Sequence, residues 1–178
     1  FCGIDDEVFE YTKRGEVFPI EENIYDHIIR LFKSYKGKQD RMRDKAIKVL
    51  IEMTVPQNDN KVVILDSTDI VESALNGLVA IRISEKINKP VLIGKKLNDG
   101  SFAGSGRNFD DSPVENLREL VEMCPYVTFA QGHDSAFGMN MPEDNIMSAI
   151  EWFNTELSNI DMTKVYLCDF VFNADEIN

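Results

Sequence analysis

The sequence has few of the residues that build covalent or metal-held frameworks. It contains three cysteines among 178 residues, and none of them forms a Cys-x-x-Cys motif. An odd number of widely spaced cysteines supports neither a disulfide framework nor a zinc site. We therefore expect reduced cysteines that pack as small apolar groups in a cytoplasmic protein.

Long apolar runs and the common catalytic motifs are also missing. No segment approaches the roughly eighteen apolar residues that a membrane-spanning helix needs, so no membrane contact is expected. The chain opens Phe1-Cys2-Gly3 without Met or a signal-peptide pattern, which indicates a fragment of a longer protein. We find no Ser-His-Asp order, P-loop lysine, His-Glu-x-x-His motif or acidic cluster with metal spacing, so no metal ligand is expected here.

Charge is strongly uneven along the chain. The net charge is −12, which argues against non-specific coating of nucleic acid. However, residues 30–48 carry eight Lys or Arg against two acids, and residues 82–107 carry six against two. Residues 108–163 sum to −10. This pattern fits a focused polyanion site on an acidic body, and the alternative is that both basic segments are solvated helix faces.

Hydrophobic periodicity predicts an α/β fold with a mixed parallel/antiparallel sheet of about six strands, flanked by helices and preceded by a two-helix connector. Two successive helical stripes, over residues 21–37 and 42–53, predict the connector, with Gly37 ending its first helix. Later helices are expected at residues 76–88, 113–124 and 142–157, and strands at residues 61–66, 91–97, 101–107, 126–130, 137–141 and 164–172.

Two short segments contain the candidate site residues. Ser105, Gly106, Arg107 and Asn108 end a predicted strand, where backbone N–H groups, a hydroxyl and a planar guanidinium suit a phosphate. Gly132-His133 lies in a predicted loop between two strands, where a histidine can contact phosphate or relay a proton. The alternatives are an ordinary surface arginine and a histidine that caps its own loop. The other histidine, His27, is expected to be exposed on the first helix.

The order of these pieces resembles the DHH-associated, substrate-binding domain of RecJ-like single-stranded-DNA exonucleases, members of the DHH phosphoesterase superfamily. The resemblance rests on three motifs in register with their flanking strands and helices. They are Gly77-Leu78-Val79 opening a helix before Pro90-Val91-Leu92-Ile93, then Gly104-Ser105-Gly106-Arg107-Asn108, and then Gly132-His133-Asp134-Ser135-Ala136-Phe137-Gly138.

The resemblance implies a parent 5′-to-3′ exonuclease whose separate DHH domain holds manganese or magnesium and hydrolyses phosphodiesters with metal-activated water. No cofactor is expected in this fragment, which is predicted to be inactive alone. The resemblance divides the chain into three parts: an acidic segment and basic connector (residues 1–58), the DHH-associated domain (59–163) and a strand leading to an OB-type domain (164–178). Single-stranded DNA is the implied partner, with DNA repair or replication proteins as further partners.

By the same resemblance, Ser105, Gly106, Arg107, Asn108 and Gly132 would grip phosphate, while His133 would also face the scissile region as the catalytic residue. The connector would line a channel for the strand through Lys33, Lys36, Lys38, Arg41 and Arg43.

The chain departs from the family pattern at Gln131, where a second glycine is usual, and at Asn108, where serine is common. The domain also resembles parts of nanoRNA and cyclic-dinucleotide phosphodiesterases, so a short RNA or a dinucleotide is the alternative substrate. A non-catalytic interaction module, in which the acidic face of residues 108–163 binds a protein, is the third reading.

Overall fold

The computed structural model describes residues 7–163, which fall into two compact units divided between Asp44 and Lys45. The first unit contains a hairpin of β1 (Glu7–Lys13) and β2 (Glu16–Glu22), followed by most of helix α1 (Ile24–Glu52). The hairpin turns at Arg14-Gly15, where both residues have positive φ. Asn23 caps α1, because its Oδ1 accepts hydrogen bonds from the N–H groups of Tyr25 and Asp26.

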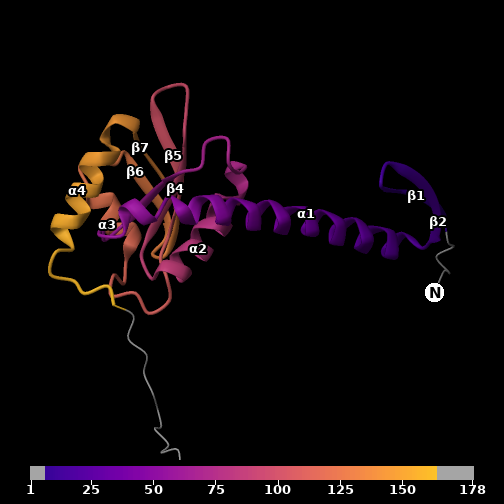
Figure 1. Ribbon diagram of the computed structural model, residues 1–178, viewed down its shortest axis with the longest axis horizontal. Coiled ribbons are helices and arrows are strands. Elements are labelled where there is room, and N and C mark those ends of the chain that lie inside the picture. Colours follow the sequence, from indigo (N-terminus) through magenta and orange to yellow (C-terminus); the bar gives the residue numbers. More distant parts are fainter. Residues whose placement is uncertain (1–6, 164–178) are drawn as a thin grey trace, which may run out of the picture. The chain divides into compact units, whose positions relative to one another are not determined.

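The prediction of a two-helix connector is wrong, because α1 continues without a break from Ile24 to Glu52 (Figure 1). A glycine inside a helix costs only about 1 kcal/mol relative to alanine, and no proline follows Gly37 within the helix. His27 is also not free on the surface. Its ring stacks on Phe9 with 3.8 Å between the centroids, and its Nδ1 lies 3.0 Å from Glu22 Oε1.

The second unit is built on a five-stranded mixed sheet with the strand order β3-β4-β5-β7-β6. Its strands are β3 (Val63–Asp66), β4 (Val91–Lys96), β5 (Ser101–Arg107), β6 (Phe129–His133) and β7 (Ala136–Pro142). Only β3 and β4 pair in parallel, joined by α2 (Asn76–Ile87). The other neighbours pair antiparallel, as the Asp99-Gly100 turn between β4 and β5 predicted.

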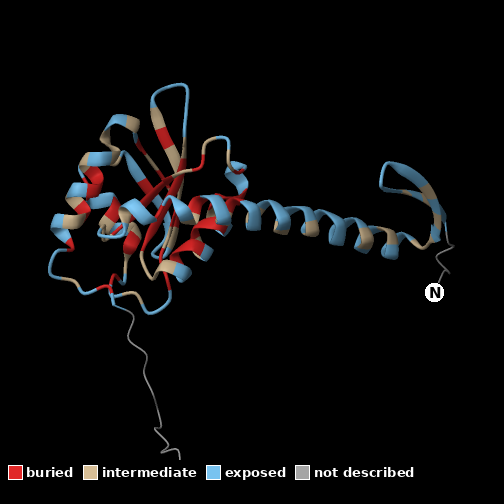
Figure 2. Ribbon diagram, in the orientation of Figure 1, coloured by how far each residue is buried: buried red, intermediate tan, exposed pale blue. Residues whose placement is uncertain are grey.

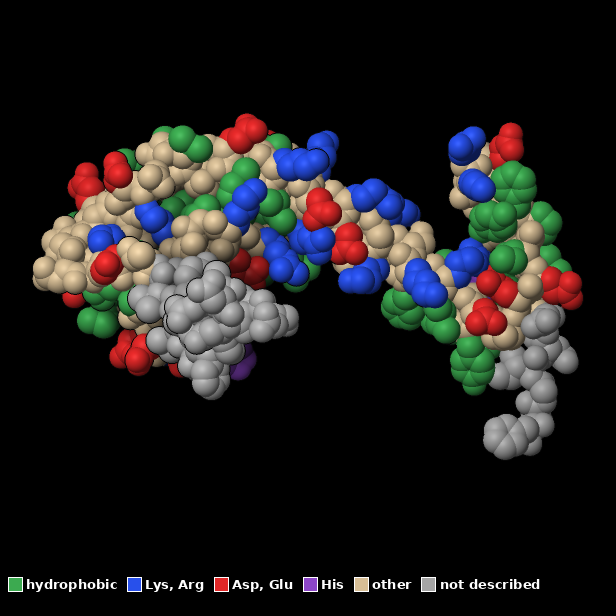
Figure 3. Space-filling view, turned by 60° about the horizontal axis from the view of Figure 1, so that its bottom comes forward, with side chains coloured by type: hydrophobic (Ala, Val, Ile, Leu, Met, Phe, Trp, Pro, Cys, Tyr) green, Lys and Arg blue, Asp and Glu red, His purple; other side chains and the backbone are tan. Residues whose placement is uncertain are grey.

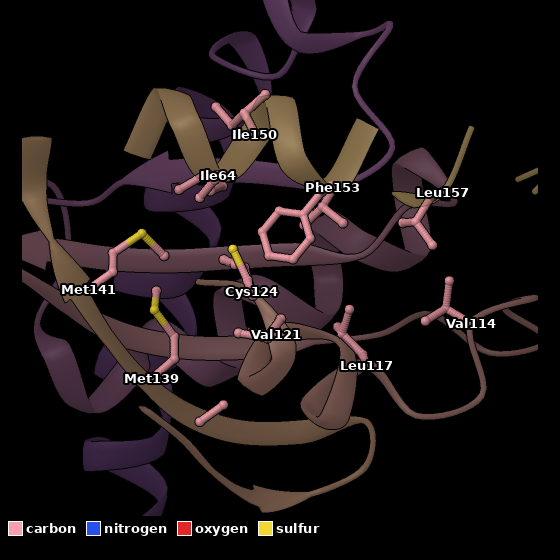
Figure 4. Close-up of a cluster of buried hydrophobic side chains, with 14 of the residues drawn as sticks. Ile64, Val114, Leu117, Val121, Cys124, Met139, Met141, Ile150, Phe153 and Leu157 are labelled. Atoms are coloured by element: carbon pink, nitrogen blue, oxygen red, sulfur yellow. The ribbon is translucent and has the colours of Figure 1, made fainter. Parts of the chain in front are cut away.

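Both faces of this sheet carry a hydrophobic core, which explains the continuous apolar run in β3 (Figure 2). On one face, Val63 and Leu65 pack with α2 and with Ala46 and Leu50 from the end of α1. On the other face, Ile64 packs with α3 (Leu117–Met123) and α4 (Ile146–Glu156). Figure 4 shows Phe153 of α4 directed toward Cys124, and both residues belong to this core. The result is a three-layer arrangement of helices, sheet and helices.

The α/β class and the mixed sheet are confirmed, and two details differ from the expectations. Helix α3 begins at Leu117 instead of Pro113, because Asn116 supplies the cap that accepts from Glu119 N–H. His133 is the last residue of β6, and the turn itself is Asp134-Ser135. The sixth expected strand, at residues 164–172, lies outside the described residues. None of the helices in the described part of the chain combines the length and apolar character needed to cross a bilayer.

Candidate functional site

Two predicted site residues, Ser105 and Arg107, lie on the same face of β5. Side chains alternate across a strand, so Phe102 and Gly106 face the α3–α4 core while Ser105 and Arg107 face the side of α2. Their register confirms this, because Ser105 pairs with Ile93 and Arg107 pairs with Val91, both in the core against α2. The end of β5 therefore presents a hydroxyl and a guanidinium beside the start of α2.

A cavity of about 450 Å³ lies at this point. Three segments far apart in the sequence form its walls: the start of α2, the end of β5 with the following loop, and the β6–β7 turn. The lining residues are Ser73, Ala74, Gly77, Leu78, Ile81, Ser105, Arg107, Asn108, Phe109, Asp110, Ser135 and Ala136. The cavity thus combines one guanidinium and three hydroxyls with an apolar wall from α2 and a carboxylate, Asp110.

The Arg107 guanidinium has no carboxylate partner among the residues that the structure describes. Its Nη1 donates to the Gly106 carbonyl at 2.6 Å and to the Phe137 carbonyl at 3.4 Å. Burial lowers the pKa of Arg107, yet an arginine stays protonated in proteins. Five N–H donors cannot all be satisfied by two carbonyls, so the remaining donors of a partly desolvated cation are available to an anion in the cavity.

The start of α2 lies against the guanidinium. Buried Asn76 anchors this helix end, because the Ser67 hydroxyl lies 3.0 Å from Asn76 Oδ1 and 3.0 Å from the Gly94 carbonyl. Gly77 follows, and a Cβ at this position would overlap Arg107 Nη2 and lie 3.0 Å from Cζ. A glycine is therefore needed for the guanidinium to occupy this place. The amino-terminal end of a helix also favours a negative charge nearby.

Asn108 lines the cavity, but its side chain is used within its own loop. Its Nδ2 donates to the Val114 carbonyl at 2.6 Å, and its Oδ1 accepts from Phe109 N–H at 3.1 Å. Only 4% of Asn108 is exposed. These bonds hold the loop that carries Phe109 and Asp110. Gly106 is absent from the cavity lining, since its face of β5 meets the Phe137 ring.

Gly132 and His133 do not line the cavity. Gly132 has φ +141°, and a Cβ there would lie 2.8 Å from the Ala136 carbonyl, so this position requires glycine. His133 is exposed on the edge strand. It pairs with Ala136, which in turn pairs with Arg107, so His133 shares the face of Arg107 two strands away.

The basic connector residues belong to the first unit, and Figure 3 shows Lys and Arg side chains along α1. Arg43 is paired with Asp40 at 2.8 Å and with Asp44 at 2.7 Å. Lys36 lies 3.9 Å from Asp40, and Lys38 Nζ is 5.5 Å from the Tyr35 ring centroid. Within the described residues, Lys33 and Arg41 form no ion pair, so the five connector cations differ in how freely they can meet a phosphate.

The described residues do not fit a metal site. Between Glu7 and Thr163, no group of three or more His, Cys, Asp or Glu side chains has a metal-binding arrangement.

Several cavity residues were missed by reasoning from the sequence. Asp110 and Ser135 lie in turns and Ser73 begins a short 3-10 helix, none of which carries a periodic signal. The contact between Gly77 and Arg107 joins residues thirty positions apart. One signal was present, because a glycine just inside a helix start is unfavourable for the helix and calls for a reason.

Comparisons with known proteins agree with this fold. No family model matches the chain. Its sequence is 27% identical over 160 residues to a putative prophage-derived single-strand DNA-specific exonuclease, YorK, of Bacillus subtilis, covering 85% of this chain and 27% of that protein. The same values apply to the corresponding protein of Bacillus phage SPbeta.

Among solved structures, RecJ of Thermus thermophilus in complex with Mn²⁺ matches with a TM-score of 0.54 and 18% identity, over 70% of this chain and 18% of that one. An exonuclease RecJ bound to manganese matches with a TM-score of 0.52 and 19% identity, over 76% of this chain and 33% of that one. The predicted resemblance to RecJ-like exonucleases is confirmed. The chain spans about a quarter of the length of the curated relatives it matches.

Proposed function

We propose that this chain is the substrate-binding part of a RecJ-like 5′-to-3′ single-stranded-DNA exonuclease, and that its cavity holds a nucleic-acid phosphate. The observation that carries the proposal is the guanidinium of Arg107, partly desolvated in the cavity and without a carboxylate partner among the described residues. The sequence similarity to a single-strand DNA-specific exonuclease supports the choice of substrate class.

In this proposal Arg107 provides the charge and the geometry of recognition. Its planar fork donates two parallel hydrogen bonds to phosphate oxygens, which a lysine cannot reproduce. The hydroxyls of Ser105 and Ser135 line the same cavity and donate to further oxygens. The adjacent helix start of α2 adds a favourable dipole. Asp110 at the cavity wall repels a second anionic group, so one phosphate is the expected occupant.

The proposal also assigns separate roles to the parts of the parent enzyme. Metal-dependent hydrolysis would be performed by a DHH domain of the parent with manganese or magnesium, and this chain would position the strand. His133 shares the sheet face of Arg107 and is exposed, so it is the candidate for contact with the scissile region. The connector cations Lys33, Lys36, Lys38, Arg41 and Arg43 would add sequence-independent attraction for the strand.

The test is the affinity of the 178-residue chain for a 5′-phosphorylated dT octamer. We expect Arg107→Ala to weaken binding by about 10- to 100-fold, the value of a hydrogen bond to a charged group. The slope of log affinity against log salt should decrease by about one charge. Arg82→Ala is the matched control, because this exposed α2 arginine is already paired with Glu85 at 3.2 Å and does not line the cavity.

Other outcomes would reject the phosphate site or indicate one of the two alternative functions. Unchanged affinity and an unchanged salt slope in Arg107→Ala would reject the phosphate site. A dinucleotide that displaces a 20-mer at equal concentration would indicate a nanoRNA or cyclic-dinucleotide phosphodiesterase. Absence of oligonucleotide binding, together with protein capture that survives Arg107→Ala and His133→Ala, would indicate an interaction module.

A further inference from the structure

The sheet face that carries Arg107 continues across β7 and β6, where its side chains remain accessible. Helix α2 contacts β4 and β5. Cross-strand register places nine residues on this face, three on β5 beside α2 and six on β7 and β6, and every one of them is half-buried or exposed. We call them the open strip. Its three rows are Arg107–Ala136–His133, Ser105–Gly138–Gln131 and Ala103–Asn140–Phe129.

The composition of the open strip suits a polyanion with flat bases. None of its nine residues is acidic, although the chain as a whole has a net charge of −12. In its first two rows the middle strand contributes the small residues Ala136 and Gly138, so the floor is low there between polar side chains on either side, and Asn140 fills the middle of the third row. A Cβ placed on Gly138 would lie 3.8 Å from the Gly104 carbonyl oxygen and 3.9 Å from the Gln131 carbonyl oxygen, which are ordinary contacts, so a small side chain would fit here without a clash.

Phe129 is the unusual residue of this surface. The other phenylalanines of the sheet, Phe102 and Phe137, are buried on the opposite face, whereas 44% of Phe129 is exposed. An accessible aromatic ring on an open sheet face is a platform on which bases of single strands stack, largely without regard to their sequence.

We propose that Phe129 stacks on a base of the bound single strand, a few nucleotides from the phosphate at Arg107. Phe129 lies four residues along β6 and two strands across from Arg107, a separation of about 17 Å from strand geometry. A stacked strand rises about 3.4 Å per nucleotide, and an extended strand about twice that distance, so the separation corresponds to roughly three to five nucleotides. The inference rests on the proposed function, because it takes the phosphate at Arg107 as the start of the path.

The affinities of 5′-phosphorylated dT dinucleotide and dT octamer test this path on the full chain. Phe129→Leu should leave the dinucleotide affinity unchanged, because a dinucleotide ends before Phe129. The same substitution should lower the affinity for the octamer by about 5- to 100-fold, which is the contribution of one stacked base. Phe129→Trp should retain octamer binding. Met123→Ala is the control, because Met123 is an exposed apolar residue of α3, on the other side of the sheet.

A second readout follows the stacked base directly. When 2-aminopurine is moved through the octamer, its fluorescence should be quenched most at one position between the third and fifth nucleotides, and Phe129→Leu should remove that quenching. Gly138→Val adds bulk to the floor of the open strip, and it should lower the affinity for the octamer more than the affinity for the dinucleotide.

The two proposals fail in distinguishable ways. If Arg107→Ala weakens both probes while Phe129→Leu affects neither the octamer affinity nor the quenching, the phosphate site stands and the stacking platform is refuted. Equal loss of both probes in Phe129→Leu would also refute it, since that indicates damage to the fold. If Arg107→Ala changes neither probe, the proposed function itself fails.

Discussion

The contact between Gly77 and Arg107 predicts that adding one methyl group, in Gly77→Ala, lowers the affinity for phosphate without lowering the stability of the fold. In Gly77→Ala the new Cβ would overlap Arg107 Nη2, which is the far end of a flexible side chain, so the guanidinium moves and the helix does not. A shift of about 1 Å takes a donor outside the 2.7–3.2 Å range of a good hydrogen bond. We expect the phosphate to lose part of a charge-assisted hydrogen bond, about 1–2 kcal/mol or 5- to 30-fold in affinity.

The fold should not lose stability from the same change. Gly77 has helical backbone geometry without positive φ, and alanine is favoured over glycine inside a helix by up to about 1 kcal/mol. The unfolding midpoint of Gly77→Ala should therefore stay unchanged or rise by about 2–4 °C. Thermal unfolding without ligand and titration with the 5′-phosphorylated octamer measure the two effects separately.

Two controls make the prediction for Gly77→Ala sharp. Gly37→Ala is the same substitution inside α1, where the new Cβ would lie 3.5 Å from Arg41 Nη1, an ordinary contact. It should leave binding unchanged. In an Arg107→Lys background, the narrower cation tolerates the methyl group, so Gly77→Ala should have no further effect. The reasoning is refuted if Gly77→Ala binds like the parent, or if affinity and midpoint fall together.

Two further predictions concern hydrogen bonds of the site loop and the hairpin. Asn108→Ala leaves the Val114 carbonyl and the Phe109 N–H without partners, and should lower the free energy of unfolding by about 2–5 kcal/mol in urea titrations. A residue that only touched ligand would change affinity without changing stability. Hydrogen bonds from Arg30, and then from His27, lower the pKa of Glu22. Their stabilisation of the hairpin–helix contact is complete above the unfolded pKa of about 4.3 and is lost as the pH falls through the lower folded pKa. The Phe9 and His27 ring signals in NMR should report this loss, and Glu22→Gln should abolish the pH dependence.

The sequence predicted those features that depend on local pattern. The apolar run of β3, the Asp99-Gly100 turn and the Asn76 helix start all have short-range signals, and each is in the structure. The common face of Ser105 and Arg107 also follows from the two-residue period of a strand.

The features that were missed depend on contacts between distant residues. Gly37 looked like a helix end because glycine disfavours helix, but tertiary packing of Ala46 and Leu50 holds the end of α1 in place. Asn108 looked like a ligand-binding residue, and its partner Val114 is visible only when the loop is folded. The hairpin of β1 and β2 was not predicted, although Arg14-Gly15 lies between two alternating segments.

Because three distant segments form the cavity, a bound anion should change amide hydrogen exchange across the second unit. The walls of the cavity come from residues 73–81, 105–110 and 135–136, so the cavity exists only when the β3–β4 and β5–β7 pairings are both formed. A bound anion therefore opposes global opening of the second unit and leaves local fraying unaffected. At a hundred times its dissociation constant it adds about 2.7 kcal/mol to the protection of the slowest-exchanging amides. Amides in the first unit, which lies outside this linkage, keep their exchange rates.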